Sequence, residues 1–456
     1  MEWIFFLIGL IPYFVEMYFL KYALMYKKPE SNKFSNEPFV SIHVPIHKEP
    51  PDVVISTLES LKRQEYKNYE VLCLVNNTPE DTLKKPVEDY CKKEGKIFKY
   101  HYIETKGYKG GTLNKAIDLC HPKTEIIGIV DSDYHVCSDF IRKGVSYFNN
   151  QIAIVQFPQD YRDFPKTLFY KAMYLSYRYF FAVIMRMCHT LNAVAFMGTV
   201  GFIRKESIQK TGEWSENIIT EDSEMGLRMN LKGFKGVYVD ESVGKGLMPF
   251  TWYSCRKQRF RWAYGNAQTL AKHLPALIFT KTLNFKQKMA FVIQNTVWHT
   301  PLIYSLIFTY TPGCLSFLGA GLLTGFLISR FYSFLWLFRK IDNLTFSEAI
   351  LALVFYFSLF FPMSYAPIRV LIPINIPFYR TPKSKEKEKE KTLYIGEIFI
   401  ILFTLFEAMV CIIEKKWIGI YVCFFSILFF ICFLWIHKQS KVSNPIYNSL
   451  SLASAN

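Results

Sequence analysis

The chain has 456 residues, of which 51% are hydrophobic and 17% aromatic, and its formal net charge is +16. The apolar excess gathers in a short N-terminal stretch and after about residue 288, which argues against a wholly soluble protein. Lysine and arginine flank these apolar stretches without a zinc-finger spacing or a repeated basic helix, so the composition favours a membrane and argues against nucleic acid as a partner. The ten cysteines form no Cys-x-x-Cys pair, which predicts buried thiols rather than disulfides or a metal cluster.

The first apolar run, residues 3–24, predicts a membrane anchor over residues 1–27. It has neither a basic leading segment nor a clear cleavage site, so we expect it to be retained. Lysines lie near the end of the run, at position 21, and after it, at positions 27 and 28, whereas only Glu2 precedes it. By the positive-inside rule the N-terminus lies outside and the next domain lies in the cytoplasm.

Residues 35–272 have the pattern of an α/β domain. Short β-rich runs cover 39–48, 69–75, 125–131 and 152–157, and helical patterns such as 52–64 and 112–120 lie between them. This alternation predicts a mostly parallel sheet with flanking helices, which binds ligands at the carboxyl ends of its strands.

The remaining chain predicts an interfacial helix over 273–287 and a multi-span α-helical membrane region over 288–437, followed by a polar tail over 438–456. The expected spans are 289–311, 314–337, 347–372, 394–413 and 416–436. Prolines and Arg369 interrupt the third span, so crossing, bending back and lying along the surface all stay open.

A loop over residues 376–392 carries a run of alternating lysine and glutamate. Such a run must lie in water, and its lysines favour the cytoplasm. If this loop and the α/β domain are both cytoplasmic, an even number of crossings separates them. The third apolar span would then not cross the bilayer simply.

Asp131-Ser132-Asp133 follows a buried apolar strand and is the first candidate for chemistry. Two carboxylates one residue apart at a strand end can face one hard cation, which would carry the diphosphate of a nucleotide. Taken alone, the pattern fits a turn equally well, because aspartate and serine favour turns.

Three further segments in chain order strengthen this interpretation. Lys109-Gly110-Gly111 offers backbone amides and a charge to a phosphate, although a plain turn fits it too. Thr220-Glu221-Asp222 opens a helical pattern, where the acids either cap the helix or supply a catalytic base. In Gln258-Arg259-Phe260-Arg261-Trp262, arginines can hold phosphate and a tryptophan can stack on a sugar ring. The alternative for that string is a basic helix at the membrane surface.

These motifs, in this order and ahead of a membrane region, resemble the family 2 inverting glycosyltransferases. The likeness is to their processive membrane branch, which includes the cellulose, glucomannan and hyaluronan synthases, and it covers about residues 40–272 with the flanking spans. The resemblance implies a GT-A fold. It also implies transfer of sugar from a nucleotide-sugar donor to a growing β-linked polysaccharide at the cell membrane, with translocation of the product.

The resemblance also implies roles for individual residues. Asp222, with Glu221 beside it, would supply the catalytic base, and Asp131 and Asp133 would hold Mg²⁺ or Mn²⁺. The implied donor contacts are Lys109, Asn76, Asp131, Gln258 and Arg261, and the implied acceptor contacts are Trp262, Gln159, Gly198 and Thr199. Phe378, Thr381 and Lys383 resemble the gating loop of cellulose synthases, although Arg380 stands where that pattern has valine.

One departure from the family concerns the nucleotide. The family usually places an aspartate at the end of its second strand, where it meets the base, but this sequence has Asn76-Asn77 there. An asparagine both donates and accepts hydrogen bonds. The choice between a UDP-linked and a GDP-linked donor therefore stays open.

Two other functions remain possible on the sequence alone. A non-processive enzyme that makes a glycolipid, like the ceramide glucosyltransferases, carries similar motifs and would take a lipid acceptor instead of a glycan. A membrane transporter or receptor with a degenerate glycosyltransferase domain is the second alternative. The size of the product distinguishes a polysaccharide synthase from an enzyme that makes a glycolipid. Nucleotide release from sugar donors would exclude the transporter or receptor.

Overall fold

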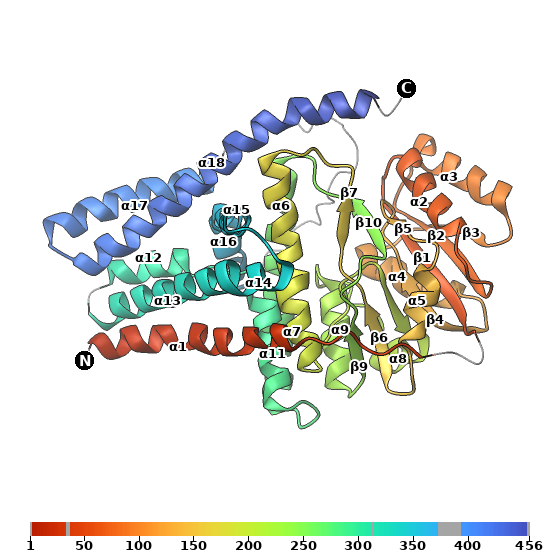
Figure 1. Cartoon of the computed structure of the whole chain (residues 1–456), viewed down its shortest axis with the longest axis horizontal. Coiled ribbons are helices and arrows are strands. Elements are labelled where there is room, and N and C mark those ends of the chain that lie inside the picture. The colour runs from red at the N-terminus through yellow and green to blue at the C-terminus, as the bar shows by residue number, and fades with distance from the viewer. Residues whose placement is uncertain (1, 33–36, 312, 373–393, 454–456) are drawn as a thin grey trace.

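The computed structural model describes residues 2–32, 37–311, 313–372 and 394–453, with side chains described as far as Ser443. The gating-loop residues suggested by the sequence, Phe378, Thr381 and Lys383, lie outside these ranges. In Figure 1 a sheet with its covering helices occupies one end of the molecule, and long apolar helices extend from the other end.

A seven-stranded sheet forms the α/β domain, in the order β3-β2-β1-β4-β8-β6-β9. All neighbouring strands in it pair in parallel, except that β8 runs antiparallel to both β4 and β6. The mostly parallel sheet expected from the sequence is therefore confirmed. The strands are β1 Phe39–Ile46, β2 Tyr69–Asn76, β3 Phe98–Ile103, β4 Thr124–Ile129, β6 Ile152–Gln156, β8 Gly201–Arg204 and β9 Lys235–Tyr238.

Helices cover both faces of this sheet because its strands are apolar on both sides. Apolar side chains of α2 (Pro51–Lys62), α3 (Asp81–Glu94) and α5 (Phe140–Ser146) pack on one face. Side chains of α4 (Tyr108–Leu119), α8 (Lys205–Thr211) and α9 (Glu221–Leu231) pack on the other. A second, three-stranded sheet has the order β5-β10-β7 and consists of β5 His135–Val136, β10 Gly244–Leu247 and β7 Asp160–Arg162.

The described residues contain four helical segments long and apolar enough to cross a membrane: Glu2–Met25, Cys314–Asp342, Ile395–Ile413 and Trp417–Ser443. They contain the helices α1 (Glu2–Leu20) with η1 (Lys21–Met25), α13 (Cys314–Phe331) with the π-helix η3 (Tyr332–Phe338) and α14 (Arg339–Asp342), α17 (Ile395–Ile413) and α18 (Trp417–Ala453). The doubtful third span is a pair of helices, α15 (Phe346–Ser358) and α16 (Phe360–Val370), bent by 44° at their junction. This bend fits a broken span or a re-entrant segment.

Two of the apolar helices, α1 and α13, lie side by side (Figure 1). Their backbones touch at Gly321, where a Cβ atom would run into the carbonyl of Phe6. Small residues allow such close approach in membrane helices. Glu16 of α1 forms a buried ion pair with Arg330 of α13 and accepts a 2.6 Å hydrogen bond from Ser329 Oγ. Helix α1 is thus bound to α13 by packing and by charge.

The helices of the C-terminal region differ from the expected bounds in two places. The interfacial helix predicted over 273–287 is divided between α10 (Trp252–Phe279) and α11 (Phe285–Thr296). The expected span 289–311 is divided between α11 and α12 (Leu302–Tyr310), because Pro301 has no amide proton to continue a helix. The polar tail from residue 438 continues α18 as far as Ala453.

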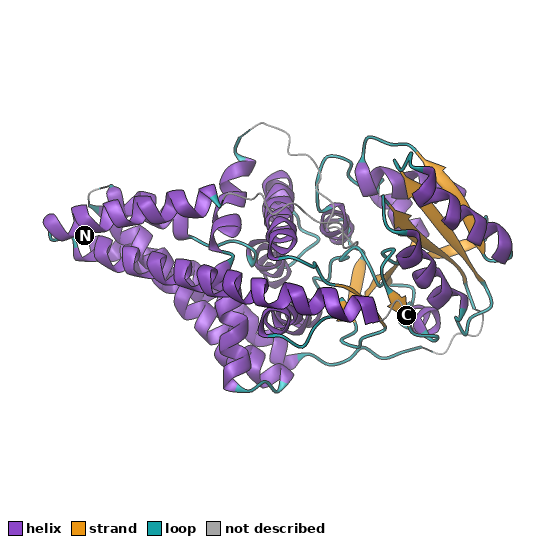
Figure 2. Ribbon diagram, turned by 90° about the horizontal axis from the view of Figure 1, so that it is seen from above, coloured by secondary structure: helices purple, strands orange, loops and turns teal. Residues whose placement is uncertain are grey.

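The α/β domain and the membrane helices share one apolar core. Its centre is a helical layer between the seven-stranded sheet and the apolar helices, formed by α6 (Leu168–Tyr179), the π-helix η2 (Phe180–Met185) and α7 (Arg186–Thr190). Arg178 of α6 joins the two parts electrostatically, since its guanidinium lies 2.7 Å from both Asp240 and Asp342. In Figure 2 the strands lie at one end of the molecule and the long helices at the other, with helices between them.

Candidate active site

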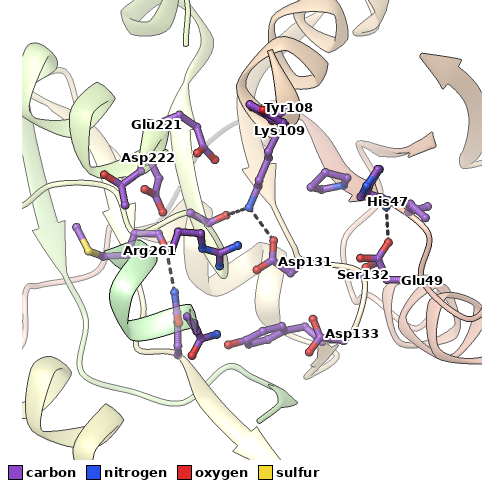
Figure 3. A pocket seen from close by; sticks show the side chains of 18 of the residues that line it. His47, Glu49, Tyr108, Lys109, Asp131, Ser132, Asp133, Glu221, Asp222 and Arg261 are labelled. Carbon is purple, nitrogen blue, oxygen red and sulfur yellow. Dashed lines mark hydrogen bonds and ion pairs between the residues drawn. The ribbon is translucent and has the colours of Figure 1, made fainter. Parts of the chain in front are cut away.

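A cavity of about 220 Å³ opens at the carboxyl ends of β1, β2 and β4. This is the edge where a parallel sheet binds ligands, and Figure 3 shows the side chains that converge there. Eleven residues that the sequence indicated line this cavity: Asn76, Lys109, Asp131, Asp133, Gln159, Gly198, Glu221, Asp222, Gln258, Arg261 and Trp262. We call it the main cavity.

Lys109 and Asp131 face each other inside the main cavity (Figure 3). Lys109 Nζ donates a 2.7 Å hydrogen bond to Asp131 Oδ1 and a 2.9 Å hydrogen bond to the Gly198 carbonyl. Burial alone would lower the pKa of Lys109, but the carboxylates of Asp131 and Glu221 outweigh it and raise the pKa. Lys109 therefore stays cationic and can neutralise a negatively charged group.

The structure extends the sequence interpretation of the glycine pair. Gly110 and Gly111 lie within the first turn of α4, which begins at Tyr108. A Cβ atom on Gly110 would come 2.6 Å from the Ser215 carbonyl, so this turn packs tightly against a neighbouring loop. The glycines thus allow α4 to approach that loop and bring Lys109 into the cavity.

Asp131 and Asp133 lie on the loop that follows β4, and the protein holds both in place. The Asp131 amide donates a 2.9 Å hydrogen bond to Thr199 Oγ1, and Asp133 Oδ2 accepts a 2.8 Å hydrogen bond from the Leu247 amide. Thr199, which the sequence suggested as an acceptor contact, is buried and supports the Asp131 backbone instead of lining the cavity.

The two aspartates fit a divalent cation whose remaining ligands would be oxygens of a nucleotide diphosphate. Among the described residues no group of three or more His, Cys, Asp or Glu side chains could hold a metal ion by itself. Mg²⁺ is commonly bound through one or two carboxylates together with substrate phosphate oxygens. A donor set of two carboxylates suits that mode of binding and does not suit a permanent structural metal site.

Glu221 and Asp222 lie in the first turn of α9 and face the same cavity. Burial, reinforced by the neighbouring Asp222 carboxylate, raises the pKa of Glu221 to about 7. Burial also raises the pKa of Asp222, which accepts a 2.8 Å hydrogen bond from the Ser223 amide. Raised carboxylate pKa values in a cavity are typical of acid–base groups.

Three members of the Gln258–Trp262 string share one face of α10. Gln258, Arg261 and Trp262 line the main cavity, as the helical spacing i, i+3 and i+4 requires. Burial lowers the pKa of Arg261, while Glu221 and Asp222 favour its charged form. Gln258 accepts a hydrogen bond from the Tyr177 hydroxyl, which fixes its orientation.

Arg259 points away from the main cavity. Its side chain is 1% exposed, and its guanidinium carbon lies 4.0 Å from the centre of the Tyr177 ring and 4.8 Å from that of Trp262. Its Nη2 donates a 2.7 Å hydrogen bond to Ser176 Oγ. Of the two arginines in this string, Arg261 therefore lines the main cavity, whereas Arg259 belongs to the aromatic packing behind it.

The segment from Met197 to Thr199 is shaped by Gln156 at the end of β6. Gln156 Oε1 accepts a 2.7 Å hydrogen bond from the Met197 amide, and its Nε2 donates a 2.9 Å hydrogen bond to the Thr199 carbonyl. Gln159 Nε2 donates a 2.9 Å hydrogen bond to the Met197 carbonyl. These bonds place Gly198 between Lys109 and Asp222.

Several lining residues were not indicated by the sequence, among them His47, Glu49 and Tyr108. His47 and Glu49 follow β1 directly, as Asp131 follows β4, so the strand-end rule applied to β1 would have found them. His47 Nδ1 lies 2.8 Å from the Asn76 carbonyl, and Asn76 Nδ2 donates a 3.1 Å hydrogen bond to the Tyr108 carbonyl. These two contacts connect the end of β2 with the loop after β1 and with the start of α4.

Comparison with solved structures supports the fold. A mannosyltransferase from Pyrobaculum calidifontis, PcManGT, solved in complex with GDP-Man and Mn²⁺, aligns with a TM-score of 0.50 at 16% identity, covering 76% of this chain and 94% of that one. The likeness shows the GT-A fold that the sequence suggested.

Curated sequences similar to this chain include plant enzymes. Glucomannan 4-beta-mannosyltransferase 2 from Arabidopsis thaliana is 25% identical over 63% of this chain and 59% of its own length. Glucomannan 4-beta-mannosyltransferase 1 from Oryza sativa subsp. japonica is 27% identical over 53% of this chain and 49% of its own length. The chain thus spans about half the length of these relatives.

A family profile shows how much of the chain matches a known protein family. The profile of "Glycosyl transferase family group 2" matches residues 126–368, from the strand before Asp131 to the bent helix pair α15–α16. This match covers more than half of the chain and includes Asp131, Asp222 and Gln258. The chain belongs to glycosyl transferase family group 2.

Proposed function

We propose that this protein is a membrane-integrated, inverting glycosyltransferase that transfers a hexose from a nucleotide-sugar donor to a carbohydrate acceptor. One observation carries the proposal. Asp222 lies where the main cavity meets a second cavity of about 70 Å³, and it lines both. A base at such a junction reaches the reacting groups of two substrates that enter from different sides.

Asp222 would remove the proton from the acceptor hydroxyl as that oxygen attacks the anomeric carbon. The attack comes from the face opposite the nucleotide, so an α-linked donor gives a β-linked product. General-base catalysis of this kind contributes about a hundredfold to ten-thousandfold in rate. Glu221 is the neighbour of Asp222 in the sequence. Because its pKa is raised to about 7, its carboxyl group can both bind and release a proton at neutral pH.

The opposite wall of the main cavity suits the donor. Lys109 and Arg261 place two positive charges beside Asp131, and preorganised charges that stabilise a leaving diphosphate lower the barrier to transfer. Gln258 would add an amide contact to the donor, and Asn76 would contact the nucleotide. Trp262 would carry the terminal acceptor sugar on its ring, with Gln159 and Gly198 beside it.

Asp131 and Asp133 would hold Mg²⁺ or Mn²⁺ together with the donor diphosphate. The cation supplies further neutralisation of the departing diphosphate. PcManGT, solved with GDP-Man and Mn²⁺, supports this proposal by its shared fold. Because Asn76 does not decide which nucleotide base the donor carries, the activity assay includes both GDP-linked and UDP-linked donors.

We further propose that the acceptor is a growing β-linked polysaccharide at the cell membrane, which the apolar helices translocate. The similarity to glucomannan 4-beta-mannosyltransferases supports this acceptor class. The α/β domain, residues 35–272, would lie in the cytoplasm and the N-terminus outside, because the lysines follow α1 instead of preceding it. Reporter fusions at either end of α1 test this orientation.

A nucleotide-release assay tests the proposed activity. The full chain in detergent or nanodiscs is incubated with GDP-mannose, UDP-glucose or UDP-GlcNAc and Mg²⁺ or Mn²⁺, and the products are sized. We expect release with one of these donors, loss of transfer in Asp222→Asn, and a polymeric product. A lipid that carries a single sugar would show a glycolipid synthase instead. No release with any nucleotide sugar would contradict the enzyme assignment.

A further inference from the structure

Arg259 of α10 is a buried cation that lies behind the wall of the main cavity. It is 1% exposed, and among the described residues its guanidinium forms no ion pair with a carboxylate. The hydrogen bond from its Nη2 goes to the neutral hydroxyl of Ser176. A charge removed from water costs free energy, which a counter-ion usually offsets.

Two other buried arginines show the usual arrangement. Arg330 of α13 pairs with Glu16, and Arg256, on the same helix as Arg259, pairs with Glu397 of α17. Arg330 is buried to the same extent as Arg259. Arg259 therefore differs from them in lacking an anion, not in its depth of burial.

Three aromatic rings surround the Arg259 guanidinium and offset part of the cost. Its central carbon lies 4.0 Å from the ring centre of Tyr177, 4.8 Å from that of Trp262 and 5.4 Å from that of Trp298. Such rings attract the positive charge but do not replace a hydrogen-bond acceptor. In the part of the chain that the structure describes, Nε and Nη1 of Arg259 have no hydrogen-bond partner.

A third cavity, of about 10 Å³, lies between α6, α10 and the apolar helices, and Arg259 lines it. Tyr179 also lines this cavity, is 2% exposed, and has a hydroxyl without a partner among the described residues. The Tyr356 hydroxyl in the same wall donates a 2.8 Å hydrogen bond to the Val297 carbonyl. No described aspartate or glutamate lines the cavity. Its polar atoms without partners can thus all donate, and its wall carries a positive charge.

The size of the third cavity restricts its ligand. A cavity of this volume holds a single particle about as large as a water molecule. Sugars, phosphate and sulfate are too large, which leaves a water molecule or a monatomic anion. A water molecule would leave the charge of Arg259 unbalanced, whereas a halide ion accepts several hydrogen bonds and also neutralises the charge.

We propose that the third cavity binds one chloride ion. Nε and Nη1 of Arg259 and the hydroxyl of Tyr179 would donate hydrogen bonds to it. Because Arg259 packs against Tyr177 and Trp262, the ion would stabilise the aromatic layer that supports Gln258 and Trp262 in the main cavity. A ligand that binds only the folded state raises stability as its concentration rises. The inference goes beyond the proposed glycosyl transfer and does not depend on it.

Thermal unfolding of the full chain in detergent tests this site. Sodium chloride is exchanged for sodium gluconate at constant ionic strength, since gluconate is too large for the cavity. We expect the thermal midpoint to rise by about 1–3 °C for each tenfold increase in chloride above half-saturation. Bromide should replace chloride, and crystals grown in bromide should show an anomalous scattering peak beside Arg259.

Arg259→Met removes the charge and keeps an unbranched side chain, so its midpoint should be the same in chloride and gluconate. The matched control is Arg256→Met combined with Glu397→Gln, which removes a buried arginine together with its partner and should keep the wild-type response to chloride. If Arg259→Met does not fold, Tyr179→Phe provides the test. It keeps the ring that stacks on Phe334 and removes one donor. The chloride concentration for half-maximal stabilisation should then rise about tenfold.

Three results would overturn the inference. The first is an equal thermal midpoint of the wild type in chloride and in gluconate. The second is a response of Arg259→Met or Tyr179→Phe to chloride that equals that of the wild type. The third is an ordered water in the third cavity with bromide peaks only elsewhere, which would assign the space to water. None of these measurements uses sugar transfer, so their failure is distinguishable from failure of the proposed function.

Discussion

The Asp222 carboxylate lies against the α-carbon of Gly198, in the space that a side chain at position 198 would fill. A Cβ atom on Gly198 would run into Asp222 Oδ2. Gly198 also has a φ of +84°, a backbone conformation that L-residues rarely adopt. The carbonyl of the same residue accepts a hydrogen bond from Lys109. Gly198 thus separates the proposed base from the positively charged donor side.

We therefore expect Gly198→Ala to abolish most activity by displacing Asp222. Gly313→Ala is the control, because Gly313 has a similar φ of +80°, and among the described residues no atom beyond its chain neighbours lies within 4 Å of an added Cβ. Both variants carry the backbone strain of about 1–2 kcal/mol, whereas only the first disturbs the site. Turnover and thermal midpoint are measured for both. Equal activities in the two variants would contradict the role assigned to this contact.

Asp222→Asn should reduce sugar transfer by about a hundredfold to ten-thousandfold, the usual contribution of a general base. Donor affinity should change little, because Lys109 and Arg261 remain. Product formation and equilibrium binding of the nucleotide are the two measurements. Asp118→Asn, an exposed position on α4, should behave like the wild type. A large loss of nucleotide affinity in Asp222→Asn would place Asp222 on the donor side instead.

The rate should fall as the medium becomes acidic, because the base Asp222 must be deprotonated and burial raises its pKa above the ordinary aspartate value. The Asp222 carboxylate raises the pKa of Glu221, so the two groups titrate as a pair. Glu221→Gln removes one member of this pair, and the acidic limb of the rate profile should then follow a single ionisation. An unchanged limb in this variant would show that the two carboxylates do not titrate as a pair.

Glu221 also has a consequence for stability. Its pKa is about 7 in the folded protein against an ordinary 4.5, so the folded state disfavours the charge and stability falls as pH rises between these values. Glu221→Gln should therefore raise the thermal midpoint at pH 8 and leave it nearly unchanged at pH 4, where the carboxyl is protonated in both states. Melting curves at the two pH values measure the difference.

Lys109→Met should lower kcat/KM for the donor by about tenfold to a hundredfold, as expected from losing a hydrogen bond between charged groups. Lys115→Met on the same helix is the matched control, since Lys115 is exposed and donates to the Glu104 carbonyl outside the main cavity. Steady-state kinetics at varied donor concentration distinguish the two. If both variants kept wild-type kinetics, Lys109 would have no part in binding the donor.

Chelation of divalent cations should stop nucleotide release, and Mg²⁺ or Mn²⁺ should restore it. Asp131→Asn should raise the metal concentration needed for half-maximal rate, because a neutral amide binds a hard cation more weakly than a carboxylate. Asp133→Asn should also lower the thermal midpoint, since Asp133 is 2% exposed and accepts the Leu247 amide. Full activity in the presence of chelator would contradict a metal requirement.

The strands and the acidic motifs were predictable because their signals are local. β1, β2, β4 and β6 are short apolar runs, and their expected positions agree with the structure to within a few residues. The membrane region was less predictable. An apolar run such as 289–311 does not reveal that its polar residues, including Gln294, pack inward from a helix that ends before Pro301.

The sequence by itself determined the α/β class, the order of the acidic motifs and the presence of long apolar helices. These features follow from residue type, strand and helix periodicity, and hydropathy, which depend on neighbours along the chain. Only the tertiary structure decided that Arg261 lines the main cavity while Arg259 is packed against Tyr177, and that Thr199 supports Asp131 from behind. It alone brought Gln294 to a cavity next to Asp222. Such choices depend on packing between segments far apart in the chain, which no local pattern encodes.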